Sequence, residues 1–260
     1  MSSKLQKDTP VLIVGGGPVG MTMALCLAKR GIASYLVELR TADALPDVKC
    51  NHIASRSMEL FRSLGISQDL RAAGLPDDYP HDVSYRTSTL GEEIARIHIP
   101  GRSTRLTDHS GPDGNWPTPE PPHRLNQRYI EPILRQHVQK QALITCLHRH
   151  QVMAFSQDEF GVTAQIQNLE WPDTPALTLN AAYMVGCDGG RSMVRKGIGA
   201  KLVGDEVVQR VQSTCIRAPH LKALMKAPPA WAMFTVNPKR SGNIYAIDGK
   251  EVWLIHNYLR

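Results

Sequence analysis

The sequence predicts an α/β protein whose strands and helices alternate in the first part and whose last part is rich in strands. Three observations lead to this prediction. An apolar strand runs into a glycine-rich turn near the N-terminus, a later apolar strand runs into an Asp-Gly pair, and strand-like runs dominate after residue 207. Continuously apolar strands are typical of a parallel sheet that is covered on both faces.

The first turn has the form of a dinucleotide-binding fingerprint. The strand Val11-Leu12-Ile13-Val14 leads into Gly15-Gly16-Gly17-Pro18-Val19-Gly20. We expect Gly15 to allow the sharp turn, Gly17 to let phosphates approach the backbone, and Gly20 to let helix and strand pack closely. Pro18 suits the first helical turn. That turn, which includes Val19, offers free N–H groups and partial positive charge to an anion.

The segment after the turn supports this interpretation. Residues 21–28 continue as a helix that Gly31 can end, and residues 33–39 form a second strand. Glu38 comes 18 positions after Gly20, where an acidic residue binds ribose hydroxyls in such folds. Arg40 follows at the strand exit, and it either lies along the adenosine or pyrophosphate or is a solvated surface arginine. The alternative for the whole motif is a glycine-rich turn without a ligand.

The middle of the chain predicts further helices and strands. Ser55 is the expected N-cap of an amphipathic helix that ends near Gly65, and a proline-rich segment at 110–122 must be a loop. The other predicted elements are strands within 83–99, a helix at 126–140, a third parallel strand at 143–147, and a hairpin of 152–155 with 161–166. Late strands are predicted at 207–216, 231–236, 243–247 and 251–255.

The second motif is the strand 182–187 followed by Asp188-Gly189-Gly190 and a helix that starts near Arg191. An aspartate at the carboxyl end of a parallel strand points into the crevice where α/β sheets bind ligands, and the glycines let a cofactor approach closely. The alternative is that Asp188 caps the helix.

Composition narrows the class of protein. The 260 residues are 42% hydrophobic and 21% charged, with scattered basic residues and a net charge of +6, which is typical of a globular protein. No apolar run is long enough to span a bilayer, no signal peptide is evident, and we expect a cytoplasmic location without nucleic-acid or membrane partners. The five cysteines contain no CxxC pair, so neither a disulfide framework nor a metal site is expected.

Together the two motifs resemble those of the FAD-dependent aromatic hydroxylases, the group similar to para-hydroxybenzoate hydroxylase and the phenol and polyketide hydroxylases. The matching segments are the glycine turn, Cys187-Asp188-Gly189-Gly190-Arg191-Ser192-Met193-Val194-Arg195, Arg124-Leu125-Asn126-Gln127-Arg128-Tyr129-Ile130-Glu131, and the helix of 51–65 with its Arg56. Lys49 stands where many members have an arginine, and it keeps the charge without the planar fork.

The resemblance implies an FAD-dependent monooxygenase that uses NAD(P)H and O2 to hydroxylate a small aromatic substrate, phenolic or polyketide-like. It places Gly15, Gly17, Pro18, Val19, Gly20, Glu38, Arg40, Gln127, Asp188 and Gly189 at the cofactor, with Gln127 alternatively a capping or surface residue. It implies no side-chain catalytic residue, since the flavin carries the chemistry. The oligomeric state stays open, with a homodimer among the options.

The implied fold is a Rossmann-like FAD-binding domain of the glutathione reductase type with an inserted β-rich substrate domain whose C-terminal part is missing. The expected boundaries are 1–80 with 122–197 for the FAD-binding domain and 81–121 with 198–260 for the substrate domain, where Trp231, Phe234 and Tyr245 either line the substrate pocket or belong to the core. The family's later Gly-Asp motif is not expected at Gly204-Asp205, which comes too early and lies in a strand-like region.

Two other functions remain open from the sequence. An NAD-dependent dehydrogenase could use the same glycine turn, although it gives no reason for the Asp188-Gly189 pair. The other alternative is a catalytically inactive fragment that acts as a nucleotide-binding or interaction module.

Overall fold

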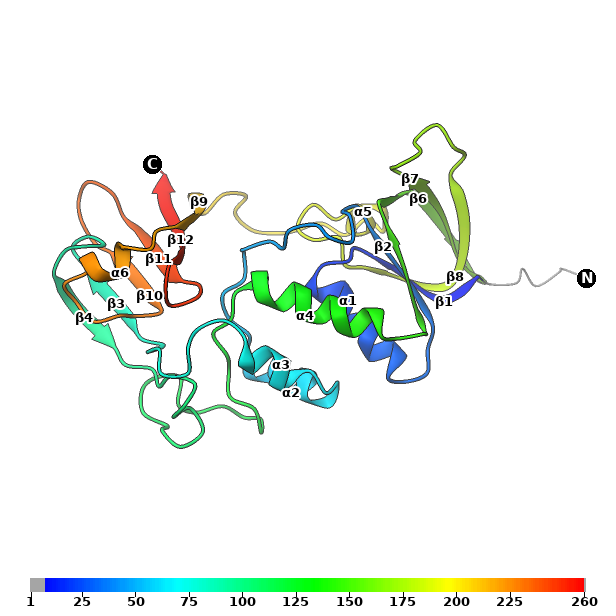
Figure 1. The fold of residues 1–260 in the computed structure, drawn as a ribbon. Coiled ribbons are helices and arrows are strands. Elements are labelled where there is room, and N and C mark those ends of the chain that lie inside the picture. Colours follow the sequence, from blue (N-terminus) through cyan, green and yellow to red (C-terminus); the bar gives the residue numbers. More distant parts are fainter. Residues whose placement is uncertain (1–7, 260) are drawn as a thin grey trace, which may run out of the picture. The chain divides into compact units, whose positions relative to one another are not determined.

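The computed structural model describes residues 8–259, and the chain divides into two compact units (Figure 1). The first unit is Met1–Pro46 with Glu131–Val203, and the second is Asp47–Ile130 with Gly204–Arg260. Each unit contains one six-stranded sheet and an apolar core of its own. These units are defined by packing, so the predicted boundaries of the functional domains stay a prediction.

The sheet of the first unit has the strand order β5-β2-β1-β8-β7-β6. Its strands are β1 (Thr9–Val14), β2 (Ser34–Glu38), β5 (Ile144–His148), β6 (His150–Asp158), β7 (Gly161–Asn168) and β8 (Leu177–Gly186). The neighbours β5-β2-β1-β8 are parallel, whereas β8-β7-β6 is an antiparallel run. The predicted parallel strands and hairpin are thus confirmed. β8 begins earlier than predicted because its first half pairs with β7.

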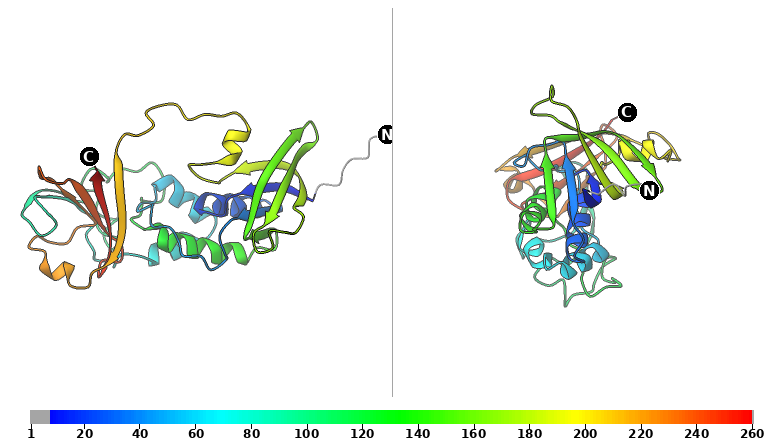
Figure 2. Two further views of the ribbon diagram at one scale, coloured as in Figure 1. Left: turned by 90° about the horizontal axis from the view of Figure 1, so that it is seen from above. Right: turned by 90° about the vertical axis from the view of Figure 1, so that its right-hand side faces the viewer.

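Helices cover one face of the parallel strands, and the β6–β7 hairpin of the same sheet packs over the other face. Helix α1 (Pro18–Ala28) packs against β1, β2 and β5, and α4 (Gln127–Gln139) lies along the same face (Figures 1 and 2). On the other face, Leu12 and Val14 of β1 form one buried cluster with Val152 and Ile166 of the hairpin. The same cluster includes Val194 of the short helix α5 (Met193–Gly197). The central strands β1 and β2 are therefore largely buried, as their apolar runs predict, whereas β5 at the sheet edge is only partly buried.

The second unit contains a sheet with the order β4-β3-β10-β11-β12-β9. Its strands are β3 (Val83–Arg86), β4 (Glu93–Ile97), β9 (Arg210–Arg217), β10 (Ala232–Thr235), β11 (Gly242–Ala246) and β12 (Val252–Leu259), and its helices are α2 (Ser55–Ser63), α3 (Ser67–Ala72) and α6 (Leu221–Leu224). Only β3 and β10 pair in parallel. Met233, Ile244 and Trp253 form the centre of the core on one face of this sheet.

Three local predictions were wrong. The N-cap of α2 is Ala54, and Ser55 is the first helical residue, whose hydroxyl makes no capping hydrogen bond. Residues 207–209 do not belong to a strand, because β9 pairs with β12 only from Arg210 onward. The pair Gly204-Asp205 therefore lies in an irregular segment and not in the strand-like region that the sequence predicts.

Three histidines of the second unit, His52, His81 and His123, are held in the neutral form. Burial, together with the positive charge of nearby arginines, lowers the pKa of His52 to about 4, of His81 to about 3 and of His123 to about 4. His81 and His123 are 3% exposed, and the His123 ring lies 3.0 Å from the Leu70 carbonyl oxygen. The folded unit therefore binds fewer protons than the unfolded chain between about pH 4 and the ordinary histidine pKa of 6.5.

We expect the second unit to lose stability as the pH falls from 6.5 towards 4, because these histidines bind protons in the unfolded chain but not in the folded unit. His81→Gln should reduce this pH dependence, whereas His220→Gln, at an exposed position, should leave it unchanged. Urea unfolding followed by tryptophan fluorescence between pH 7 and pH 4.5 measures the effect, since Trp116, Trp231 and Trp253 all lie in this unit. Equal slopes for His81→Gln and the parent chain would contradict the assignment.

Candidate functional site

The glycine turn joins the carboxyl ends of three parallel strands. The Gly15 N–H donates to the Val37 carbonyl at 2.8 Å, and the Cys187 N–H donates to the Val14 carbonyl at 2.7 Å. Gly15 has a φ of +105°, and a Cβ there would collide with the Cys187 carbonyl. Gly15 is therefore required both by its conformation and by the close approach of the β8 turn.

The start of α1 is open and electropositive. A Cβ on Gly20 would collide with the Gly15 carbonyl, so Gly20 is where the helix packs onto its own turn, as predicted. By contrast, a Cβ on Gly17 would meet nothing within 4 Å, which leaves the space beside the first helical turn open. Pro18 is in that turn, Val19 is 69% exposed, and the turn contains no acidic side chain. The partial positive charge at this end of α1 has no acidic partner within that turn.

Glu38 closes this turn from the end of β2. Its Oε2 accepts from the Gly16 N–H at 2.6 Å, and its Oε1 accepts from the Arg40 N–H at 2.9 Å and from Arg40 Nε at 3.0 Å. A Cβ on Gly16 would lie 2.8 Å from the Glu38 Cβ. The middle glycine, to which sequence reasoning gave no role, is thus the position that lets Glu38 approach the turn.

Arg40 is held by two carboxylates at the strand exit. Its Nη2 lies 3.2 Å from Oε2 of Glu131, whose side chain is only 1% exposed, and Arg135 Nη2 lies 4.0 Å from the same oxygen. The surface-arginine alternative for Arg40 does not fit this geometry. Glu131 was missed as a site residue, because its link to Arg40 spans 91 positions of sequence.

A cavity of about 200 Å³ lies beside Glu38 and Arg40. Its lining includes Gly16, Leu36, Val138, Cys146 and His148. Burial raises the pKa of the Cys146 thiol and lowers the pKa of His148, so both groups favour the neutral form there. The cavity thus combines apolar walls with a charged rim.

Asp188 is held by three hydrogen bonds at the start of α5. Its Oδ1 accepts from Ser192 Oγ at 2.5 Å, and its Oδ2 accepts from the backbone N–H groups of Met193 at 2.6 Å and Val194 at 3.2 Å. Burial alone would raise the pKa of Asp188, but these hydrogen bonds outweigh it and lower the pKa. The N-cap of α5 is Ser192, whose Oγ accepts from the Arg195 N–H, and Asp188 adds to this cap by binding the next free N–H groups. Contact of Asp188 with a cofactor stays a prediction.

The other predicted cofactor positions, Gly189 and Gln127, belong to different elements of the fold. Gly189 has a φ of +78°, and a Cβ there would meet nothing within 4 Å, so the backbone beside it is open. Gln127 is the first residue of α4 in the second unit, where its N–H donates to the Cys50 carbonyl at 2.7 Å. Lys49 and Arg56 form exposed ion pairs with Asp47 and Glu59.

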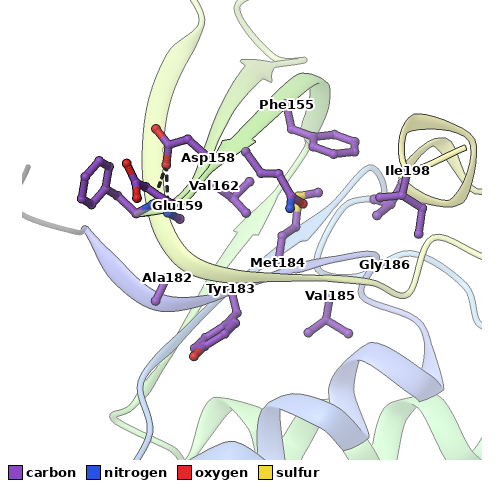
Figure 3. A pocket seen from close by; sticks show the side chains of 14 residues that line it. Phe155, Asp158, Glu159, Val162, Ala182, Tyr183, Met184, Val185, Gly186 and Ile198 are labelled. Carbon is purple, nitrogen blue, oxygen red and sulfur yellow. Dashed lines mark hydrogen bonds between the residues drawn. The ribbon is translucent and has the colours of Figure 1, made fainter.

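A larger hollow of about 550 Å³ lies on the antiparallel part of the first sheet (Figure 3). Phe155, Met184 and Ile198 lie on one side of β8, and Tyr183 and Val185 point to the other side of the strand. Asp158, at the hairpin end, accepts from the N–H groups of Phe160 and Gly161. The two carboxylates of this lining, Asp158 and Glu159, are exposed at the hairpin turn, so we take the edge formed by the glycine turn, Glu38 and Asp188 as the candidate site.

Among residues 8–259, no group of three or more His, Cys, Asp and Glu side chains could hold a metal ion. All five cysteines are free thiols. Within the same described range, no helix has both the length and the apolar character needed to cross a bilayer.

The model of the family described as "FAD binding domain" matches residues 8–258. Among curated relatives, the FAD-dependent monooxygenase apdD of Emericella nidulans is 27% identical over 96% of this chain and 40% of its own length. The phenol 2-monooxygenase of Pseudomonas sp. (strain EST1001) is 31% identical over 75% of this chain and 31% of its own length. The chain thus spans less than half the length of these relatives.

Solved structures agree with the sequence matches. Substrate-free RebC, a rebeccamycin biosynthetic enzyme, superposes with a TM-score of 0.84 at 31% identity over 97% of this chain and 47% of its own. The flavin-dependent monooxygenase PieE, solved with FAD and substrate, superposes with a TM-score of 0.84 at 27% identity over 98% of this chain and 44% of its own. The Rossmann-like FAD-binding fold with a second, β-rich part is thereby confirmed.

We expect Asp188→Asn to destabilise the first unit by about 0.5–2 kcal/mol, because an amide cannot accept all the hydrogen bonds that cap α5. The lowered pKa of Asp188 means that the parent chain keeps this contribution above the ordinary aspartate pKa of 3.8 and loses it as the pH falls through the folded value. Chemical denaturation at pH 7 and pH 3 measures both effects. Asp173→Asn, at an exposed position, is the matched control, and equal stability of the two variants would refute the capping role.

Proposed function

The chain belongs to the FAD-binding-domain family of FAD-dependent aromatic-ring monooxygenases, and from this premise we propose that its first unit binds the ADP part of FAD. The observation that carries the proposal is the open N-terminal turn of α1 at Gly17, with Glu38 held beside it. In this proposal the pyrophosphate lies against the N–H groups of that turn, which includes Pro18 and Val19. Gly15 and Gly20 act by shaping the turn.

The ribose contact is assigned to Glu38. A carboxylate has about four acceptor positions, and the backbone and Arg40 fill three of those of Glu38. One position on Oε2 therefore remains for a ribose hydroxyl that donates a hydrogen bond. Arg40 fixes the carboxylate, and the cavity beside it fits an apolar, flat group such as adenine.

The Asp188-Gly189 turn and Gln127 are proposed as further contacts of the cofactor. Gly189 supports this role because the space beside its backbone is open. Asp188 supports it indirectly, since it fixes the start of α5 at the same edge of the sheet as the glycine turn. For Gln127 the support is its place in the matching segment at the start of α4.

We further propose that the whole protein hydroxylates an aromatic, phenolic or polyketide-like compound with NAD(P)H and O2. Bound FAD supplies the oxygen-activating chemistry, and this chain's residues bind and orient the cofactor and exclude water from it. Support comes from relatives that include a phenol 2-monooxygenase and a tetracenomycin A2 monooxygenase-dioxygenase. Because the chain covers 40% of its first relative, a nucleotide-binding module without turnover is the second candidate for the 260 residues alone.

We expect Glu38→Ala to weaken FAD binding by about 1.5–3 kcal/mol, because it removes a charge-assisted hydrogen bond to the ribose and the anchor of the turn. Titration of the apoprotein with FAD, followed by flavin fluorescence, gives the dissociation constants. Glu170→Ala removes an exposed carboxylate of the same unit and serves as the control. An FAD affinity equal in Glu38→Ala and the parent would show that Glu38 does not bind the ribose.

The protein expressed from its full reading frame should purify yellow, and a phenolic compound should accelerate its oxidation of NADH or NADPH. Absorbance at the flavin bands and the decay of the nicotinamide absorbance measure the two properties. Turnover by the 260 residues alone would eliminate the inactive-module alternative. A colourless protein without bound flavin would refute the monooxygenase proposal.

A further inference from the structure

The second unit's sheet has two chemically different faces. Pairing puts Met233, Ile244 and Ile255 side by side on the face that forms the apolar core. The opposite face has a row of five paired residues that runs across five strands: Tyr85, Phe234, Asn243, His256 and Ser213. The Cβ atoms of directly paired residues lie about 4.5–5.5 Å apart, so the side chains of the row are neighbours.

Asn243, at the centre of this row, has an incomplete set of hydrogen bonds. Its Nδ2 donates to the Tyr245 hydroxyl at 2.8 Å, whereas its Oδ1 is buried and has no partner within the described residues. The residue is 6% exposed. Rotating the amide by 180° would satisfy the oxygen and leave the nitrogen alone, so one polar atom lacks a partner in either orientation. A buried polar atom of this kind costs free energy unless a partner is supplied.

Aromatic rings lie on both sides of Asn243. Tyr85 and Phe234 stack with their centroids 5.5 Å apart, and Tyr245 and His256 meet edge to face at 5.6 Å. The His256 ring is oriented by Ser213, whose Oγ lies 2.7 Å from Nδ1. An aromatic lining around one unsatisfied polar group suits a flat aromatic ligand with a single polar substituent at that point.

The charges near this face indicate whether the polar substituent of the ligand is neutral or charged. Arg124 is a cation that acts on Tyr245, and it stacks 4.4 Å from the Trp231 ring and pairs with Asp113 at 2.8 Å. Arg124 thus already has an acidic partner, and the other polar groups of the row are neutral hydroxyls, an amide and an imidazole. Burial lowers the pKa of His256, which favours its neutral form. The face therefore favours a neutral group over a carboxylate or phosphate.

We propose that Asn243 is a specificity-determining residue that recognises a hydroxyl group on the aromatic substrate. Because Nδ2 already donates to the Tyr245 hydroxyl, the free Oδ1 can accept a hydrogen bond that the substrate hydroxyl donates. The inference rests on the proposed function for the existence of an aromatic substrate, and it deepens that function by naming which group is recognised and by which side chain. Sequence reasoning named Phe234 and Tyr245 for the substrate pocket but missed Asn243 between them.

The test compares 1-naphthol with 1-methoxynaphthalene, which keeps the ring system but cannot donate a hydrogen bond. Binding to the protein from its full reading frame is followed by tryptophan fluorescence, and FAD content is measured separately. The parent should bind 1-naphthol roughly tenfold more tightly, and Asn243→Leu should bring the ratio of dissociation constants close to one. Thr235→Val is the matched control, since it removes a hydroxyl from the core face of the adjacent strand and should keep the parent's ratio.

A second variant keeps the proposal testable if Asn243→Leu does not fold. Asn243→Asp is nearly isosteric, retains acceptor oxygens and should keep the preference for 1-naphthol. An unchanged ratio in folded Asn243→Leu would overturn the proposal, as would a parent protein that does not distinguish the two probes. A parent that distinguishes the probes but binds no FAD would support Asn243 while refuting the monooxygenase function. The failure of the Asn243 proposal, seen in the ratio of dissociation constants, can thus be distinguished from the failure of the monooxygenase proposal, seen in the FAD content.

Discussion

The close approach of Gly15 to Cys187 is the contact on which the candidate site of the first unit depends. The β1 turn can lie between β2 and β8 only because no side chain is present at Gly15. Two backbone hydrogen bonds, from Gly15 to Val37 and from Cys187 to Val14, then align the three strand ends. The start of α1 and the turn of Asp188 consequently emerge from the same edge. The first glycine of the motif is thus needed for packing before any ligand is considered.

The charged side chains Glu38, Arg40, Glu131 and Asp188 at this edge all have partners within the protein, without any ligand. The buried Glu131 would be costly without a cation, and Arg40 supplies one while it also orients Glu38. Asp188 is held in the same manner by backbone N–H groups of α5. In contrast, the start of α1 has no acidic side chain in its first turn. The site therefore combines fixed carboxylates with one uncompensated positive helix end, which is the arrangement that an anionic ligand with ribose hydroxyls requires.

Sequence reasoning was most successful where a motif is local. The strand, turn and helix around Gly15–Gly20 follow from apolar runs and glycine spacing, and the structure has them at those positions. It failed where the partner is remote: Glu131 lies 91 positions from Arg40, and the role of Gly16 depends on Glu38 of the next strand. The N-cap of α2 was misplaced because Ala54 and Ser55 differ in backbone conformation, which composition does not report. Resemblance supplied the cofactor's identity, since a glycine turn alone does not distinguish FAD from NAD.

The second sheet shows why aromatic residues could not be sorted into core and site from the sequence. Met233 and Phe234 are neighbours in the chain, and both are apolar, yet a strand points them to opposite faces. Which face is the core is decided by pairing with Ile244 and Ile255, and by what packs over those strands. Once that register is known, the polar residues on the other face form one row instead of isolated exceptions in separate strands. The role inferred for Asn243 could not be predicted from any one segment. It depends on an unsatisfied amide that lies among the rings of Tyr85, Phe234, Tyr245 and His256, which come from different strands.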